Sequence, residues 1–336
     1  MHENYSVDAQ ELKSWRSRLF AHLRNLFLGN QTGQGTPDSG TMDRRTALKL
    51  MGSLAAGAVL VGATATSADA QVIEPGSGRF DIEDFTPEIV QNYLLLRKII
   101  SESSELLAQH PALFYPVGSE IALPDSFFDN IDMLDLQLFE GQLVAKIALE
   151  PLQQMLQNAR DHLLSPKIIS GYRSYEFQKD TVYEPELLKV KGELQSQQAN
   201  TGLSETELAL EAEKIVSRYS SKQGHSQHHL GVAFDIVDGD HSSFDYAREH
   251  WDVGWYSWLR AHAHEYGFVL SYPRGIDNDT AKRDSGYTSS EPWHVRFVGK
   301  PLAQYLHQQD YLSADTTITA QSVLFTLHSM SQYGYK

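Results

Sequence analysis

Two short stretches of this 336-residue chain gather residue types that hold metals and move protons. The first ends at Asp235 and includes His228, and the second runs from Glu291 to His294. Zinc in a hydrolytic site takes three protein ligands of the His, Asp or Glu type and leaves a fourth position open for water. His228, Asp235 and His294 can supply the three ligands, which leaves Glu291 as a general base beside the metal.

Other residues compete for these roles. His225 and His229 flank His228, and spacing alone does not separate the three imidazoles. Asp238 and Asp240 also follow the first stretch, but the 12-residue ligand spacing of a calcium loop is missing, which favours a solvated loop. The chain contains no cysteine, so thiolate zinc ligands, a cysteine nucleophile and disulfides are all excluded.

The local sequence places both stretches beside short strands. Residues 231–236 alternate small with bulky apolar side chains, which predicts a strand with one face in a core and Asp235 on the other. Pro292 argues against a helix interior in the second stretch. Glu291 and His294 are therefore expected where a loop enters another strand, a position from which both side chains can face one point.

Together the two stretches resemble a known family. The pattern Ser-x-His-x-x-Gly-x-Ala-x-Asp at 226–235, followed by Glu-Pro-Trp-His at 291–294, resembles the VanY-type zinc D-alanyl-D-alanine carboxypeptidases of bacterial cell-wall metabolism. Three more stretches are similar to the same family, at residues 170–178, 263–273 and 294–299. The resemblance spans about residues 150–305, and five blocks in the same order make it specific although each alone is weak.

The resemblance implies a role for each of seven residues. The implied zinc ligands and catalytic base are His228, Asp235, His294 and Glu291, which selects His228 over its two neighbours. Arg173 is implied to stabilise the oxyanion of the tetrahedral intermediate, and Ser226 and Gln178 to place the substrate. A polar stretch at 189–204 is longer than the family's usual connection, so the shape of the substrate cleft stays open.

The implied reaction removes the terminal D-alanine from a peptidoglycan stem peptide by a zinc-activated water. The same residues would serve a zinc endopeptidase or an L,D-peptidase that cuts another bond of the polymer. A catalytically inactive relative that binds the cell wall is disfavoured by the intact Glu291, because metal binding does not need that free carboxylate. A structural zinc site is disfavoured because such sites are four-coordinate and usually rich in cysteine.

Residues 42–70 are typical of an export signal. The segment 43–49 resembles a twin-arginine motif, an apolar run follows at 50–63, and Ala68-Asp-Ala70 offers a cleavage site. The run is shorter than the roughly 20 residues of a membrane-spanning helix, although an uncleaved anchor is the alternative. We therefore expect an exported, periplasmic or cell-envelope protein that uses the twin-arginine export machinery. Residues 1–41 form either a basic amphipathic helix or, if translation begins at Met42, no part of the protein.

Composition and periodicity complete the expected organisation. The net charge of −15 argues against nucleic acid and anionic lipid as partners, and a monomer is expected. Helices and short strands without regular alternation predict an α+β fold, in which a small antiparallel sheet holds the zinc site between flanking helices. Helices are expected over 87–110, 141–163, 204–220, 255–266 and 300–309. The expected parts after the signal are a helical extension at 71–140, a zinc peptidase domain at 141–310 and a C-terminal tail at 311–336.

Overall fold

The computed structural model describes residues 87–119, 121–196, 204–273, 290–313 and 319–332. The N-terminal extension and the export signal lie outside this part of the chain and stay predictions. The described residues fall into two units: one contains residues 87–102 and 325–332, and the other contains the described residues between 103 and 324. Among the described residues, no helix combines the length and the apolar character that a membrane crossing requires.

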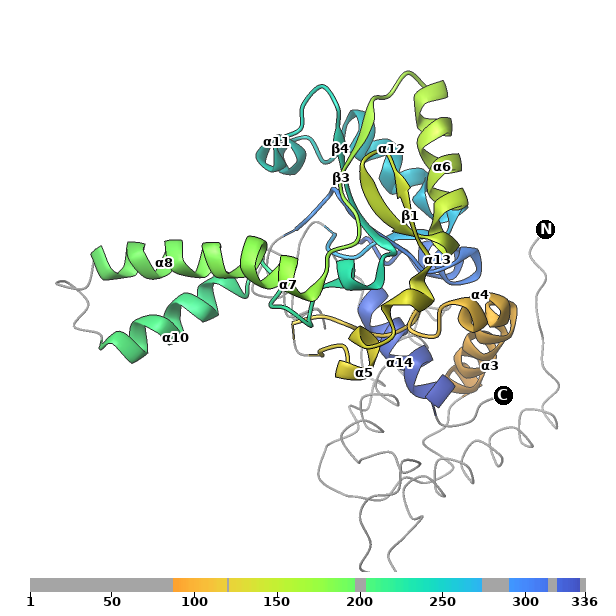
Figure 1. The fold of residues 1–336 in the computed structure, drawn as a ribbon. Coiled ribbons are helices and arrows are strands. Elements are labelled where there is room, and N and C mark those ends of the chain that lie inside the picture. Colours follow the sequence, from red (N-terminus) through yellow and green to blue (C-terminus); the bar gives the residue numbers. More distant parts are fainter. Residues whose placement is uncertain (1–86, 120, 197–203, 274–289, 314–318, 333–336) are drawn as a thin grey trace, which may run out of the picture. The chain divides into compact units, whose positions relative to one another are not determined.

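The larger unit mixes helices with small antiparallel sheets, which confirms the predicted α+β fold class (Figure 1). Its α-helices are α4 (Ser104–Gln109), α5 (Asp125–Phe128), α6 (Lys146–Asp161), α7 (Tyr175–Phe177), α8 (Glu184–Ser196), α10 (Glu205–Val216), α11 (Phe244–Glu249), α12 (Gly254–His262) and α13 (Lys300–Gln308). Its shorter helical turns are η2 (Ile131–Leu134), η3 (Gln178–Tyr183), η4 (Gln227–Leu230) and η5 (Ala263–Tyr266). Its strands are β1 (Leu136–Phe139), β2 (Gln142–Ala145), β3 (Pro166–Ser170), β4 (Ala233–Asp238), β5 (Phe268–Leu270) and β6 (His294–Phe297).

Four of these strands form one antiparallel sheet in the order β3-β4-β6-β5. Strand β4 lies inside the sheet, where its apolar side chains are buried in the core, as their alternation predicts. Asp235 of β4 stands opposite His294 of β6 and also opposite Ser170 of β3. The register of β3 shifts between Ile168 and Ser170, and such a bulge redirects the following chain. The segment after β3 is thereby directed toward Asp235.

Residues 142–145 form a strand, so the prediction of a helix from residue 141 was wrong at its start. Strand β2 pairs with β1 as an antiparallel hairpin, and α6 begins only at Lys146. The turn between the two strands is Glu140-Gly141, with φ of 47° and 81°. Two consecutive residues with positive φ match the right-handed twist of hairpin strands.

Other helices differ from their predicted bounds in small ways. The helix expected over 87–110 is divided at Ser103 into α3 (Pro87–Glu102) and α4. The helix expected over 255–266 ends at His262, and its last turn is the 3-10 turn η5. In the smaller unit, the described residues comprise α3 and most of α14 (Ala320–Gln332). The predicted C-terminal tail thus contains a helix whose Leu327 and Met330 are buried.

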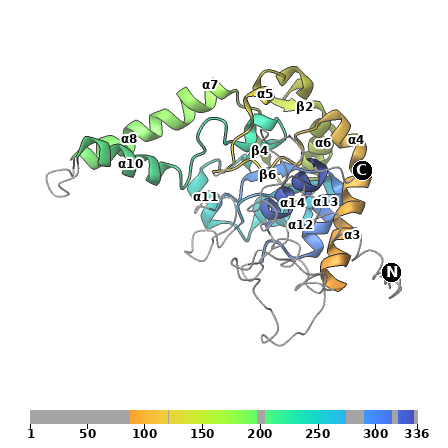
Figure 2. The same cartoon turned by 90° about the horizontal axis from the view of Figure 1, so that it is seen from below.

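Helices α8 and α10 lie side by side and project from the sheet as a helical hairpin (Figure 1 and Figure 2). The hairpin encloses a small apolar cluster of Tyr183, Val190, Ala212 and Val216. A capping box fixes the start of α10: the Ser204 side chain accepts from the Glu207 backbone, and the Glu207 side chain accepts from the Ser204 backbone. The long polar stretch predicted at 189–204 is the outer part of this hairpin, in so far as its residues are described.

Candidate metal and catalytic site

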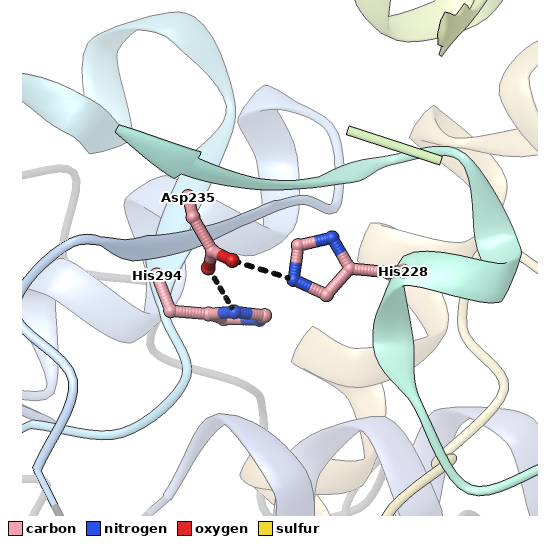
Figure 3. A group of neighbouring side chains, drawn as sticks. All are labelled: His228, Asp235 and His294. Atoms are coloured by element: carbon pink, nitrogen blue, oxygen red, sulfur yellow. Dashed lines mark hydrogen bonds and ion pairs between the residues drawn. The ribbon is translucent and has the colours of Figure 1, made fainter. Parts of the chain in front are cut away.

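Asp235 and His294 meet because their strands are paired in register. Both residues are buried, at 4% and 3% exposure, and the Nδ1 of His294 lies 3.1 Å from the Oδ1 of Asp235. Their side chains project from β4 and β6 toward the same point, which His228 also reaches from the turn before β4 (Figure 3). The distance between the two side chains is therefore set by the spacing of neighbouring strands.

His228 is carried by the short turn η4, directly before β4. The Ser226 hydroxyl caps this turn by accepting from the His228 backbone nitrogen at 3.3 Å. Gly231 ends the turn with a φ of +67°, and a Cβ there would lie 3.1 Å from carbon atoms of Ala145 and Leu136. A side chain at this position is disfavoured both by backbone conformation and by space. The turn returns His228 over the strand, with its Nε2 3.3 Å from the Oδ2 of Asp235.

The side chains of His228, Asp235 and His294 are close enough together to hold one metal ion. One ligand atom from each lies within 4.8 Å of the others. Burial lowers the pKa of His228 to about 4, so its imidazole is neutral at pH 7 and keeps a lone pair. Burial alone would raise the pKa of Asp235, but the nearby His228 and Arg173 hold it well below its ordinary value. Two imidazoles and one carboxylate are ligands that suit zinc.

Each imidazole uses its second nitrogen for a hydrogen bond that fixes its orientation. The Nδ1 of His228 donates to the backbone oxygen of Gly171 at 2.7 Å, which leaves Nε2 for a metal. A Cβ on Gly171 would lie 2.5 Å from the backbone oxygen of Leu143, so glycine allows this segment to approach β2. The Nε2 of His294 lies 3.1 Å from the Oε1 of Gln227, which leaves Nδ1 for a metal.

Glu291 lies beside the ligands without belonging to the cluster. Its Oε2 is 3.7 Å from the Nδ1 of His294, and its side chain keeps 20% exposure. The His294 backbone nitrogen donates to the Glu291 oxygen at 3.0 Å, a tight turn that presents both side chains on one side. Burial, then the charge of Asp235, raises the pKa of Glu291 to about 8, against the opposing effect of Arg173 and Arg248. A carboxyl whose pKa lies near neutral pH is typical of a general base or acid. The charge of a metal cation at the neighbouring side chains would lower this pKa and favour the ionised form, which can accept a proton.

Arg173 reaches the cluster from the segment after β3. Its guanidinium donates to Asp235 Oδ2 at 2.5 Å, and its Nε donates to the Ser170 hydroxyl at 2.8 Å. A third donor reaches the Oε1 of Gln178 at 3.4 Å, and the Gln178 amide donates in turn to the Ser221 backbone oxygen at 2.7 Å. Gln178 is buried at 1% exposure. Gln178 therefore both lines the pocket and accepts a hydrogen bond that helps to orient the Arg173 guanidinium.

A pocket of about 300 Å³ opens over these residues. All seven residues singled out from the sequence line it: Arg173, Gln178, Ser226, His228, Asp235, Glu291 and His294. Glu186 and Tyr219, near the base of the α8–α10 hairpin, line it too. The hairpin therefore contributes to the cleft whose shape the sequence leaves open.

The competing residues have other contacts. His229 accepts from the Gly224 backbone nitrogen at 3.0 Å, and its Nδ1 donates to the Arg173 backbone oxygen at 2.8 Å, so both nitrogens are used in the fold. The Nδ1 of His225 donates to the Gly118 backbone oxygen at 2.8 Å. In Asp238-Gly239-Asp240 a side-chain oxygen of Asp238 accepts from the backbone of Asp240 at 3.0 Å, as in a turn.

Three residues of the site carried no signal in the sequence. Gln227 contacts His294, and its Oε1 also accepts from the Ser271 hydroxyl at 2.7 Å. Arg248 of α11 lines the pocket, with its guanidinium 4.8 Å from the centre of the Trp293 ring. The position of Gln227 between two motif residues could have drawn attention to it. Ser271 and Arg248 follow no recognisable pattern.

Comparison with known proteins gives a family for this region. Residues 141–300 match the family model described as VanY, D-alanyl-D-alanine carboxypeptidase. A D-alanyl-D-alanine carboxypeptidase of Enterococcus faecalis is 30% identical over 175 residues, which cover 52% of this chain and 55% of the relative. One of Enterococcus faecium is 27% identical over 247 residues, covering 70% of this chain and 66% of the relative. The chain thus spans less than two thirds of the length of either relative.

Two solved structures are similar to part of this chain. VanYB in complex with D-alanine-D-alanine is 26% identical, with a TM-score of 0.41 over 58% of this chain and 91% of that one. A VanY D,D-pentapeptidase from the VanB-type resistance cassette, in complex with Zn(II), is also 26% identical. Its TM-score is 0.42 over 58% of this chain and 92% of that one.

Proposed function

We propose that this chain, whose residues 141–300 match the family model of the VanY D-alanyl-D-alanine carboxypeptidases, is a zinc-dependent D,D-carboxypeptidase. Its substrate would be a peptidoglycan stem peptide, from which it removes the terminal D-alanine. The observation that carries the proposal is the convergence of His228, Asp235 and His294 within 4.8 Å, with Glu291 3.7 Å from a ligand nitrogen. Three ligands beside a separate carboxylate are what a hydrolytic zinc site needs.

The residues present fit zinc better than calcium or magnesium. Two imidazole nitrogens are unsuited to those hard cations, which take oxygen ligands. His228 and His294 each bond through one ring nitrogen to a protein oxygen, which turns the other toward the shared point. Zinc held there would lower the pKa of a water toward about 7 and polarise the scissile carbonyl.

The chain's own residues would then manage protons and charge. Glu291 takes the proton of the attacking water and passes it to the nitrogen of the leaving D-alanine as the C–N bond breaks. Arg173, now 2.5 Å from Asp235, lies close enough to donate to the oxygen that becomes negative in the tetrahedral intermediate. Gln178 holds the guanidinium from behind, and Ser226 holds the turn that carries His228.

The decisive experiment is mass spectrometry of muropeptides after incubation with purified, zinc-loaded protein. Loss of one alanine from pentapeptide stems, with tetrapeptides and cross-links intact, is the expected result. Cleavage of cross-links would instead indicate the endopeptidase alternative, and conversion of tetrapeptides to tripeptides the L,D-peptidase. Binding of muropeptides without any cleavage would indicate an inactive cell-wall-binding relative.

We also propose that the protein acts outside the cytoplasm, since its substrate is part of the cell wall. The support is the twin-arginine-like motif with Arg44 and Arg45, the apolar run and the Ala68-Asp-Ala70 sequence. Replacing both arginines by lysine should retain the protein in the cytoplasmic fraction. Unchanged export of that variant would remove the twin-arginine pathway from the proposal.

A further inference from the structure

A buried glutamine bridges a candidate metal ligand to Ser271, the residue directly after strand β5. Gln227 is 3% exposed, and its Oε1 lies 3.1 Å from the Nε2 of His294 and 2.7 Å from the Oγ of Ser271. An amide oxygen accepts hydrogen bonds and cannot donate them. The ring nitrogen that faces it therefore carries the proton. In the neutral imidazole that a metal requires, the lone pair is then on Nδ1, which faces the Asp235 carboxylate at 3.1 Å.

We propose that Gln227, held in place by Ser271, is a positioning residue that fixes His294 in the tautomer able to bind the metal. The inference rests on the metal site of the proposed function. His228 needs no such side chain, because its Nδ1 donates to the backbone oxygen of Gly171. Among the described residues, the Nε2 of His294 has the Gln227 side chain as its hydrogen-bond partner, so its orientation depends on a residue that can be replaced. Replacing a residue that hydrogen-bonds to a metal ligand typically lowers metal affinity by about 10- to 100-fold.

Three substitutions test the bridge. Gln227→Met keeps the length of the side chain but removes the acceptor, so the zinc dissociation constant should rise by about 10- to 100-fold. Gln227→Glu offers only acceptor oxygens when ionised, so it should bind zinc at least nearly as well as the natural protein. Ser271→Ala leaves the amide free to turn, so it should weaken binding less than Gln227→Met does. Chelator competition measures all three, without any need for activity.

The double variant sharpens the test. If Ser271 acts through Gln227, then Ser271→Ala should add no further loss in a protein that already carries Gln227→Met. Equal weakening by Gln227→Glu and Gln227→Met would overturn the proposal, because it would mean that the amide nitrogen faces the ring. Normal affinity in Gln227→Met would overturn it as well. Thermal unfolding of the metal-free variants identifies any loss of fold, and the affinities stay informative even if no stem peptide is cut.

A separate observation concerns substrate recognition on the other side of the pocket. Helix α11 packs on Trp293 of the Glu291–His294 motif: the Phe244 ring is stacked on it with centroids 4.2 Å apart, and the Arg248 guanidinium lies 4.8 Å from its centre. Arg248 lines the pocket and its charge acts on Glu291, where it lowers the pKa. It forms an ion pair with Asp245 at 3.2 Å, and that partner is 89% exposed.

Arg173 and Arg248 are the arginines or lysines among the described residues that line this pocket. Arg173 is engaged by Asp235, Ser170 and Gln178 and is assigned to the oxyanion. Among the described residues, the guanidinium of Arg248 has an ion pair with the exposed Asp245, which is worth little in water, and the face of the Trp293 ring. We infer that Arg248 is a specificity-determining residue that binds a carboxylate of the substrate, an inference that rests on the proposed function. The carboxylate is either the terminal one of the leaving residue or a side-chain one of the stem peptide.

Matched peptides distinguish the two sources. Four stem pentapeptides are compared: the free acid, its C-terminal amide, a side-chain amide and the doubly amidated form. Their binding is measured by calorimetry on zinc-loaded Glu291→Gln protein, which binds without turnover, with and without Arg248→Gln. Losing one charge-assisted contact should weaken binding by roughly 10- to 100-fold, and only for peptides that carry the recognised carboxylate.

Arg260→Gln is the matched control, because Arg260 also pairs with an exposed aspartate, Asp252, and lies 5.4 Å from a tryptophan ring, that of Trp251, but does not line the pocket. It should leave all four affinities unchanged. Equal weakening of all four peptides by Arg248→Gln, or of none, would overturn the inference. Cleavage of the free acid by the natural protein tests the proposed function separately, so a failure of either is recognised by itself.

Discussion

The strands that carry the metal ligands and the α8–α10 hairpin are held by different means. His228, Asp235 and His294 are 3–4% exposed, and the second nitrogen of each imidazole faces a protein oxygen. The hairpin combines a small apolar cluster with exposed ion pairs, such as Lys191 with Glu205 at 3.4 Å. Such pairs contribute about 0–1 kcal/mol each. Buried contacts thus hold the candidate metal ligands in place. The hairpin, which also lines the cleft, is held by weaker contacts, so its position can change with little effect on those side chains.

The largest expected effect is at a metal ligand. His228→Ala should lose nearly all bound zinc, and activity should fall by on the order of 1,000-fold, because the metal supplies several kcal/mol of transition-state stabilisation. Metal content by atomic emission and cleavage of a pentapeptide measure the two effects. His225→Ala is the control and should keep both. Full zinc in His228→Ala, with loss in His225→Ala, would reverse the ligand assignment.

Next in size is the loss of the base without the loss of the metal. Glu291→Gln keeps the size of the side chain but cannot take a proton, so kcat should fall by about 100-fold or more. Zinc content should stay near one ion per chain, since Glu291 lies outside the ligand cluster. Metal analysis and single-turnover kinetics on the same sample separate the two properties. A variant that loses its zinc would show that Glu291 is a ligand.

A smaller loss, of stability and of zinc affinity, is expected from a substitution at Gly231, which ends the turn that carries His228. Gly231→Ala places a side chain at a φ of +67°, with carbon atoms of Ala145 and Leu136 3.1 Å from the new Cβ. The left-handed conformation costs a non-glycine residue about 1–3 kcal/mol, and crowding adds to this. Urea unfolding of the metal-free protein should show the loss, and zinc affinity should fall with it. Unchanged stability would mean that the turn relaxes freely.

The smallest effect, of opposite sign, is expected in the hairpin. Gly192 lies inside α8, and nothing lies within 4 Å of a Cβ built there. Gly192→Ala should therefore stabilise the helix by about 0.5–1 kcal/mol. Hydrogen exchange along α8 should slow, while zinc affinity stays the same. A change in zinc affinity would show that the hairpin and the metal site are coupled and are not held independently of each other.

The parts of the site that follow local pattern could be predicted from the sequence. His228 and Asp235 are separated by one turn and part of a strand, so ten consecutive residues determine their relative positions. The role of Gln227 could not be predicted, since its partner His294 is 67 residues away and meets it only through the pairing of β4 with β6. Nothing in the residue type distinguishes a bridging glutamine from a surface one.

Strand β2 was wrongly predicted as the start of a helix, because the turn before it has an unusual sequence. Hairpin turns with positive φ favour Asn-Gly or Asp-Gly, whereas here the turn is Glu140-Gly141. The apolar residues of β2 also continue into the period of α6, so a single long helix from residue 141 was the simpler interpretation. The strand forms because β1 pairs with it, an interaction between segments that a helical period does not reveal.

The pairing of Asp235 with His294 joins residues 59 positions apart, opposite each other on β4 and β6. A slip of one residue between the two strands would turn one of these side chains to the other face of the sheet. If the site binds zinc as proposed, only chains whose distant strands have paired in the correct register would bind the ion. The metal retained after refolding would then report correct folding, because misaligned chains would remain metal-free, and dialysis followed by metal analysis would measure their fraction.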